Sequence, residues 1–230
     1  GLVSSRSAHV IGASRRRKVY HLTDRGRDEA RDGSSQTRKS RGRSVGPVPD
    51  SITLHGRDEI VSSISSGLSK GSNYLLEGLP GIGKTSVATA VSQSLLDDGW
   101  LVRWATCQTD SDSSSIARMW LGVRAPSSND AIVARVDSKK TLLVLDEAQQ
   151  SSDRLVRGIR ELLEACSGTS AMILVVTRAP NPFPEISGFD SIRLEGLETT
   201  LARELLPEEM ADTEAIEVCK AMDGHPLGIK

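Results

Sequence analysis

The chain has 230 residues and a formal net charge of −1, and 37% of its residues are apolar, or near 46% with its 20 glycines counted. That share approaches the ~45–50% of globular proteins and is enough for a hydrophobic core. The sequence has no signal peptide and no run near the ~20 apolar residues of a membrane span, so we expect a cytoplasmic chain without a membrane partner. Cys107, Cys166 and Cys219 are too widely spaced for the paired motifs of zinc sites or disulfide scaffolds.

Basic residues gather near the amino-terminal end. Residues 1–46 contain 12 Lys and Arg against 4 Asp and Glu (+8), whereas the rest of the chain contains 17 against 26 (−9). A basic segment on an acidic body favours contact with an anionic partner, nucleic acid in the first place. A solvated basic arm is the alternative.

Residues 1–31 are predicted to be the first unit. It comprises two short strands, a basic turn and a helix: Val10–Ile11, Lys18–Leu22, the turn 12–17, and a helix from Thr23 or Asp24 to Arg31. Residues 32–50 mix Gly, Ser, Arg, Lys and Pro with almost no apolar side chains, which predicts a basic flexible linker.

From Ser51 onward strand-like and helix-like segments alternate. The predicted strands are Asn73–Leu76, Trp100–Ala105, Thr141–Leu145, Ala171–Thr177 and Ser191–Leu194. The third and fourth are continuous apolar runs, which are typical of central strands in a parallel sheet covered by helices. The helices expected between and after them are Ser86–Leu96, Asp153–Cys166, Thr199–Leu206 and Thr213–Met222. We therefore expect an α/β core over 51–196 and the start of a small helical domain over 197–230.

A phosphate-binding loop joins the first core strand to the helix after it. The run Gly78–Thr85 (Gly78, Leu79, Pro80, Gly81, Ile82, Gly83, Lys84, Thr85), followed by Ser86, fits G-x-x-x-x-G-K-[ST] without a mismatch. In such a loop Lys84 reaches the β- and γ-phosphates, the Thr85 hydroxyl ligates Mg²⁺, and the glycines let the backbone approach the phosphates. The sequence thus predicts a P-loop NTPase fold that binds a nucleoside triphosphate.

Acidic and basic residues end the two most apolar strands. Asp146 and Glu147 follow Leu142–Leu145, and at the carboxyl edge of a parallel sheet Asp146 could join the magnesium shell while Glu147 polarises the attacking water. The alternative for this pair is a helix N-terminal charge pair. Arg178 ends the fourth strand, where it could contact the γ-phosphate, and a surface salt bridge is the alternative.

The order of these motifs resembles the STAND signalling ATPases, and within them the NB-ARC branch. The segments that carry the resemblance are Leu54–Glu59, the glycine loop, Leu142–Glu147, Val175–Arg178 and Gly224–Leu227. The resemblance implies that Gly56 and Arg57 line an adenine pocket, that Thr177 and Arg178 sense the nucleotide, and that Pro226 lies against the adenine. His225 occupies a variable position of the motif, and no ligand role is assigned to it.

Residues 14–27 also resemble the wing and following helix of a winged helix-turn-helix domain. Such wings place basic residues along a phosphate backbone. The helices that precede a wing are missing here, and Lys230 follows directly on a motif, so we expect a piece cut at both ends.

Together the resemblances imply a transcriptional regulator in which ATP/ADP and Mg²⁺ set a switch. Hydrolysis would be slow, ADP would hold a closed monomer, ATP would favour a homo-oligomer of the full-length protein, and the basic head would contact DNA. Two alternatives stay open: an AAA-type remodelling or loader ATPase, and a DNA-binding transcription factor whose nucleotide site is only structural. A metabolic kinase is disfavoured because no substrate-binding insert or lid-like arginine cluster is present.

Overall fold

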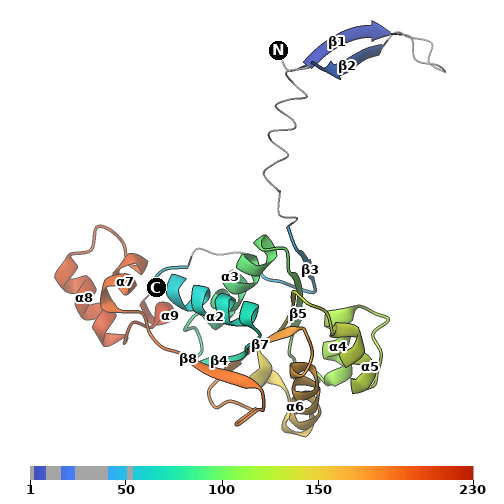
Figure 1. Cartoon of the computed structure of the whole chain (residues 1–230). Helices are drawn as coiled ribbons and strands as arrows, with labels where there is room; N and C mark the ends of the chain where they lie inside the picture. Colours follow the sequence, from blue (N-terminus) through green and yellow to red (C-terminus); the bar gives the residue numbers. More distant parts are fainter. Residues whose placement is uncertain (1–2, 9–16, 24–40, 51–53, 230) are drawn as a thin grey trace. The chain divides into compact units, whose positions relative to one another are not determined.

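The computed structural model describes residues 3–8, 17–23, 41–50 and 54–229, which belong to two compact units, 1–39 and 40–230 (Figure 1). In the first unit, β1 (Val3–Ala8) and β2 (Arg17–Leu22) pair as an antiparallel hairpin whose register runs from Val3 opposite Leu22 to Ala8 opposite Arg17.

The second predicted strand of this unit is confirmed as β2, and its partner was not predicted. The partner strand is β1, whereas the predicted Val10–Ile11 lies outside the described residues. β1 has the sequence Val-Ser-Ser-Arg-Ser-Ala, which contains no apolar run by which a strand could be predicted. A strand in a hairpin can be held by backbone hydrogen bonds alone. The predicted helix to Arg31 and most of the predicted turn also lie outside the described residues.

The second unit is built on a six-stranded sheet in the order β3-β5-β6-β7-β4-β8. All of its strand pairs are parallel. The strands are β3 (Arg43–Val45), β4 (Asn73–Gly78), β5 (Leu101–Thr106), β6 (Thr141–Asp146), β7 (Met172–Arg178) and β8 (Phe189–Leu194). Each of the five strands predicted for the core is present within two residues of its expected bounds, and β6 is buried along its whole length. The predicted α/β P-loop fold is confirmed.

β3 corrects the prediction that residues 32–50 are a linker throughout. Residues 43–45 pair with 101–103 of β5 at the edge of the sheet, the Gly42 amide donates to the carbonyl of Leu96 (2.7 Å), and Val48 packs on the core. The polar composition hid this strand because a short edge strand is held by its backbone and presents most of its side chains to solvent.

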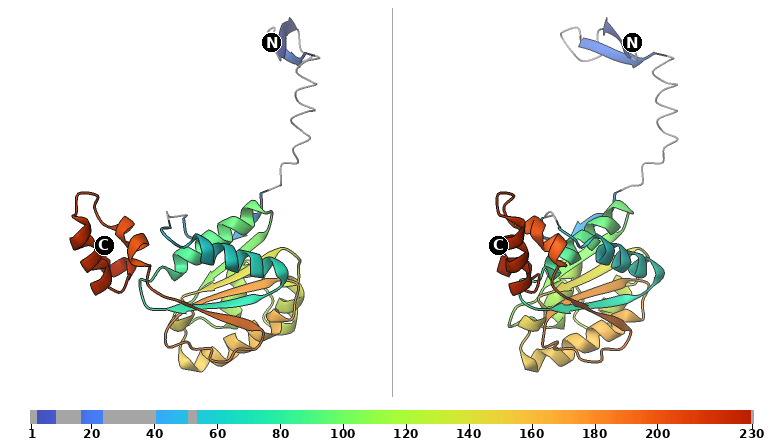
Figure 2. Two further views of the ribbon diagram at one scale, coloured as in Figure 1. Left: turned by 60° about the vertical axis from the view of Figure 1, so that its left-hand side comes forward. Right: turned by 90° about the vertical axis from the view of Figure 1, so that its left-hand side faces the viewer.

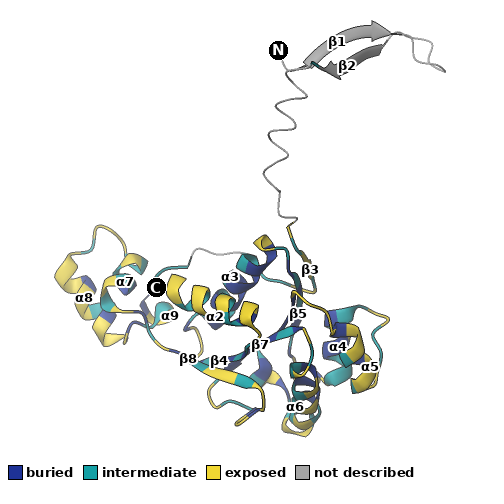
Figure 3. Cartoon of the chain, viewed as in Figure 1, coloured by how far each residue is buried: buried dark blue, intermediate teal, exposed yellow. Residues whose placement is uncertain are grey.

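Helices cover both faces of the sheet. α2 (Asp58–Lys70) and α3 (Lys84–Asp97) pack on one face through Ile64, Leu68, Val87 and Val91. α4 (Ser113–Leu121), α5 (Asn129–Val136) and α6 (Asp153–Ser167) pack on the other through Ile116, Trp120, Ile132 and Leu162. In Figure 3 the middle strands are buried, while the outer sides of α2 and α6 are exposed. The short α4 and α5 were not predicted, because eight or nine residues give few turns in which a period can show.

After β8 the chain forms a helical arm, shown in red in Figure 2. The arm consists of α7 (Thr199–Ala202), a 3₁₀ turn (Arg203–Leu205), α8 (Asp212–Ala221) and α9 (Pro226–Ile229). It has a small core of its own made by Leu197, Ala202, Cys219 and Ile229. Gly196 and Gly224 bring its two ends together: a Cβ on Gly196 would lie 1.8 Å from the Asp223 carbonyl, and the Leu197 amide donates to the Gly224 carbonyl.

Across the described part of the chain, no helix combines the length and the apolar character that a membrane crossing requires.

Candidate nucleotide-binding site

The glycine loop connects the carboxyl end of β4 to the first turn of α3. Gly81 (φ 77°) and Gly83 (φ 102°) have left-handed backbones, and a Cβ on Gly78 would lie 2.6 Å from the Leu194 carbonyl. Because Gly83 precedes α3 and has no side chain to cap it, the first amide groups of α3 are free to bind an anion. The sequence places glycine where this backbone path requires it.

Lys84 lies across the loop that precedes it. Its ammonium group donates to the carbonyl of Leu79 (2.8 Å), and the residue is only 7% exposed. Burial lowers the pKa of Lys84, and the nearby carboxylate of Glu147 partly opposes that effect. A buried cation inside a glycine loop at a helix N-terminus is suited to bind the terminal phosphates of a nucleotide.

Thr85 and Asp146 form the candidate magnesium site. The Thr85 hydroxyl lies 3.2 Å from each carboxylate oxygen of Asp146, and the Glu147 amide donates to Oδ1 of Asp146 (2.9 Å). Burial raises the pKa of Asp146 to about 6. The described residues contain no cluster of three His, Cys, Asp or Glu for a metal. A hydroxyl beside one carboxylate fits Mg²⁺, which usually takes few protein ligands and completes its shell with water and phosphate oxygens.

The buried charge of Asp146 predicts that Asp146→Asn stabilises the metal-free protein at pH 7.5. The folded pKa of about 6 exceeds the ordinary 3.8, so ionisation of this carboxyl lowers stability progressively between about pH 4 and pH 6, and the full loss is present above pH 6. A shift of about 2 units corresponds to at most about 3 kcal/mol in the free energy of unfolding. Thermal melting in EDTA should show a higher Tm for Asp146→Asn, and the gain should disappear near pH 4. The exposed Asp110→Asn is the control. A lower Tm at pH 7.5 would contradict the conclusion that burial disfavours the ionised carboxylate of Asp146.

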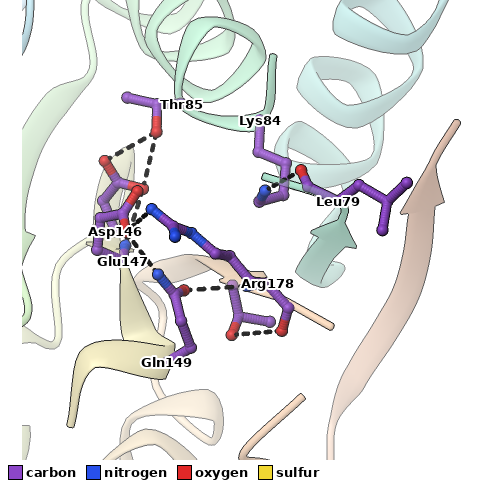
Figure 4. A network of polar contacts seen from close by, with 8 residues as sticks. Leu79, Lys84, Thr85, Asp146, Glu147, Gln149 and Arg178 are labelled. Carbon is purple, nitrogen blue, oxygen red and sulfur yellow. Dashed lines mark hydrogen bonds and ion pairs between the residues drawn. The ribbon is translucent and has the colours of Figure 1, made fainter. Parts of the chain in front are cut away.

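Glu147, Gln149 and Arg178 form a second polar cluster beside the magnesium site (Figure 4). Oε2 of Glu147 accepts from Nη2 of Arg178 (3.2 Å) and from Nε2 of Gln149 (2.5 Å). Oε1 of Gln149 accepts from the backbone amide of Arg178 (2.9 Å). The carboxyl ends of β6 and β7 are thus joined through side chains. Gln149 was missed at the sequence level, where its only mark is a polar residue two positions after Glu147.

The adenine is expected in a pocket that lies beside the glycine loop. A cavity of about 180 Å³ is lined by Leu54, His55, Arg57, Gly81, Ile82, Gly83, Ser86, Leu197, Leu205, Pro226 and Leu227. Arg57 donates to the carbonyl of Glu195, and burial lowers the pKa of this guanidinium. Arg57, Pro226 and the glycine loop therefore meet around one cavity. Gly56 does not line it; it faces Leu201 of the arm, where an added Cβ would lie 2.7 Å from the leucine side chain.

His225 links the arm to the glycine loop. Its Nε2 donates to the carbonyl of Pro80 (2.8 Å), and its Nδ1 accepts from the Gly228 amide (3.2 Å). Carrying its proton on Nε2, the neutral ring satisfies both partners. Next to it, the side chain of Leu227 lies so near Gly81 that an added Cβ there would be 2.6 Å from it. Sequence analysis gave His225 no role because it occupies a variable position of the motif, and its partner lies 145 residues earlier in the chain.

Comparison with known families decides the class. Residues 74–188, half of the chain, match the ATPase family associated with various cellular activities (AAA). The chain belongs to the AAA family. This match spans the glycine loop, Asp146, Glu147 and Arg178, and it supports ATP binding by the AAA core.

Individual proteins resemble this AAA chain only distantly. A protein of Sinorhizobium fredii, named as an insertion sequence ATP-binding protein (y4iQ/y4nD/y4sD), is 27% identical over 138 residues, which cover 59% of this chain and 44% of that protein. The chain thus spans less than half the length of this relative.

Two solved structures share the fold. One is a Signal Transduction ATPase with Numerous Domains (STAND) with a tetratricopeptide repeat sensor from Pyrococcus horikoshii (TM-score 0.54, 18% identity, 80% of this chain and 30% of that one). The other is the Drosophila ORC bound to DNA (TM-score 0.54, 14% identity, 96% of this chain and 63% of that one). At these identities the likeness concerns the fold alone.

Proposed function

We propose that this AAA core is the nucleotide switch of a STAND-type regulator, of the NB-ARC kind, which binds ATP with Mg²⁺ and hydrolyses it slowly. The observation that carries the proposal is the contact between the arm and the glycine loop through His225 and Leu227. The fold likeness to a STAND protein agrees with it. The rival is an AAA-type remodelling or loader ATPase, in which turnover would be fast.

The proposal gives a role to each charged residue around the phosphates and to Thr85. Lys84 and the amides of the loop bind the phosphates, and Thr85 and Asp146 hold Mg²⁺. The ion supplies charge neutralisation on the phosphate oxygens when bound. Glu147 orients and polarises the attacking water, and Arg178 stabilises charge that develops on the γ-phosphate.

The arm is the element whose position the nucleotide would set. The Pro80 carbonyl and Gly81 belong to the loop that would surround the phosphates, and both contact the segment that begins α9. A change in the loop backbone between ATP and ADP therefore reaches the arm directly. Pro226 lies in the same segment and lines the adenine-side pocket, so base and phosphates would both act on it. Movement of the arm is also the step by which ATP would favour a homo-oligomer of the longer protein.

Nucleotide content and turnover of the purified chain test this proposal. Bound nucleotide is released by denaturation and identified by chromatography, and phosphate release is followed with ATP and Mg²⁺. Tightly held ADP and turnover far below the roughly 1–100 s⁻¹ of kinases, near one per minute or slower, are expected. Turnover within that faster range from an initially empty site would favour the remodelling or loader ATPase.

We also infer that the amino-terminal unit is the wing of a winged-helix domain that contacts DNA. The β1–β2 hairpin is the observation that favours this function, because a wing is an antiparallel hairpin. Arg15 and Arg16 precede β2 in the sequence, and β2 itself begins with Arg17 and Lys18. The likeness to an ORC structure bound to DNA agrees with it.

Removal of the basic turn tests the wing. Replacing Arg15, Arg16 and Arg17 by Ala should weaken DNA binding and reduce the slope of log affinity against log salt by up to about 3, since each lost phosphate contact contributes about 0.9. ATP affinity should not change. The control removes three exposed charges elsewhere, in Arg124, Arg154 and Arg157. An unchanged salt slope in the first variant would show that the hairpin is not a wing on DNA.

A further inference from the structure

We propose that Arg43, Arg103 and Arg135 form a phosphate-binding site at the β3 edge of the core, and that this site takes the backbone of a nucleic acid duplex. The inference rests on the proposed contact of the chain with DNA and adds a second contact, on the core, to that of the hairpin. In the sheet, β6 and β7 separate β3 and β5 from β4, which leads into the glycine loop. The arginine site is therefore distinct from the nucleotide site.

Three elements bring the arginines together. Arg43 begins β3 and lies opposite Leu101 of β5, so its side chain is on the face of the sheet that also carries Arg103. α4 covers this face beside β3 and β5 (Figure 1), and Nη1 of Arg103 donates to the carbonyl of Trp120 in its last turn. Arg135 is in the last turn of α5, which contacts α4. The edge strand and the ends of two helices thus surround one group of cations.

The positive charges of this group are not compensated. Burial lowers the pKa of Arg103, and the neighbouring charges of Arg135 and Arg43 lower it further. Among the residues that the structure describes, no carboxylate forms an ion pair with any of the three arginines. The Nε atom of Arg103 is also buried and has no hydrogen-bond partner there. Repelling guanidinium groups with an unused donor are the setting that a bound anion stabilises.

The carboxylates nearest to the group along the chain have other partners. Asp97 pairs with Arg41 (3.2 Å), and Asp137, two residues after Arg135, accepts from the Ser170 amide (2.8 Å). A helix C-terminus attracts a cation, which accounts for Arg103 at the end of α4 and for Arg135 at the end of α5. It does not account for Arg43, which lies on a strand.

The guanidinium group and the surrounding sequence indicate the class of ligand. The planar fork of a guanidinium matches the oxygens of a phosphate, and three of them suit a ligand with several phosphates. Arg43 continues the basic sequence of residues 1–46, in which 12 Lys and Arg stand against 4 Asp and Glu. A duplex presents phosphates in rows, so it can contact both the basic segment and the edge of the core. These features favour a nucleic acid over a single small anion.

The salt dependence of DNA binding tests the site. Arg43 and Arg135 are both exposed, so Arg43→Ala with Arg135→Ala removes two charges while Arg103 keeps its bond to α4. This variant should bind a duplex more weakly, and the slope of log affinity against log salt should fall by up to about 2, since each phosphate contact contributes about 0.9. ATP affinity should stay unchanged. The control is Arg154→Ala with Arg157→Ala, which removes two exposed charges from α6. An unchanged slope, or equal losses in the two variants, would overturn the inference.

Two further outcomes separate this inference from its alternatives. Inorganic phosphate, titrated into protein whose glycine loop is filled with ADP, tests a small-anion site. Phosphate binding that depends on Arg43 and Arg135, without an effect of either on DNA binding, would overturn the assignment to a nucleic acid. A loss of salt slope on replacing Arg15, Arg16 and Arg17 alone would overturn the core site and leave the wing, and the converse would leave the core site. Failure of the unaltered chain to bind DNA would overturn both.

Discussion

Lys84→Ala is expected to weaken ATP binding by roughly a hundredfold, which corresponds to about 3 kcal/mol for a hydrogen-bonded charge pair. The ammonium group is buried, and within the described loop it donates a hydrogen bond to the Leu79 carbonyl alone. Its other protons are therefore available to the phosphates. Titration calorimetry with ATP and Mg²⁺ measures the effect.

The fold should tolerate this substitution. Burial already lowers the pKa of Lys84, which means that the charged form is disfavoured where it lies, and its removal should not lower the Tm of the nucleotide-free protein. Lys70→Ala, at the exposed end of α2, is the control and should bind ATP normally. Near-normal affinity in Lys84→Ala would place the nucleotide somewhere other than the glycine loop.

Glu147→Gln is expected to retain ATP and to lose hydrolysis by a factor of about 10²–10⁴, the usual contribution of a general base. The amide keeps nearly the shape of the carboxylate and can still accept from Gln149, but it cannot take a proton from water. ATP binding by the variant is confirmed first, and phosphate release is then measured in a single turnover. The two measurements separate an effect on binding from an effect on hydrolysis. Unchanged turnover would show that Glu147 is not the group that activates water.

The sequence predicted those parts of the molecule whose signal is local. The glycine loop is a contiguous pattern, and β6 and β7 are apolar runs, since both faces of a central parallel strand are buried. Asp146 is the last residue of β6 and Glu147 follows it directly, so the prediction of the strand also placed both residues at the edge of the sheet. Edge strands were harder: β1 and β3 are held mainly by backbone pairing and leave little mark in composition.

The contacts between distant segments could not be predicted. Gln149 reaches the backbone of β7, and His225 reaches Pro80 across 145 residues, and neither partner is indicated by a neighbouring residue. Gly56 is a further case, since nothing in its motif indicates that its neighbour in space is Leu201. In each case the three-dimensional packing of the arm and of β7 decides what the residue touches.

Hydrogen exchange of the arm, compared between the ATP-analogue and ADP complexes, tests the switch most directly. The amides of Gly228 and Ile229 report on α9, where both donate to the His225 carbonyl, and peptides over residues 78–86 report on nucleotide binding itself. We expect the loop to gain protection with either nucleotide, and α9 to exchange at clearly different rates in the two complexes. Equal protection of α9 in both, with the loop protected, would contradict the account, because the nucleotide would then bind without being read by the arm.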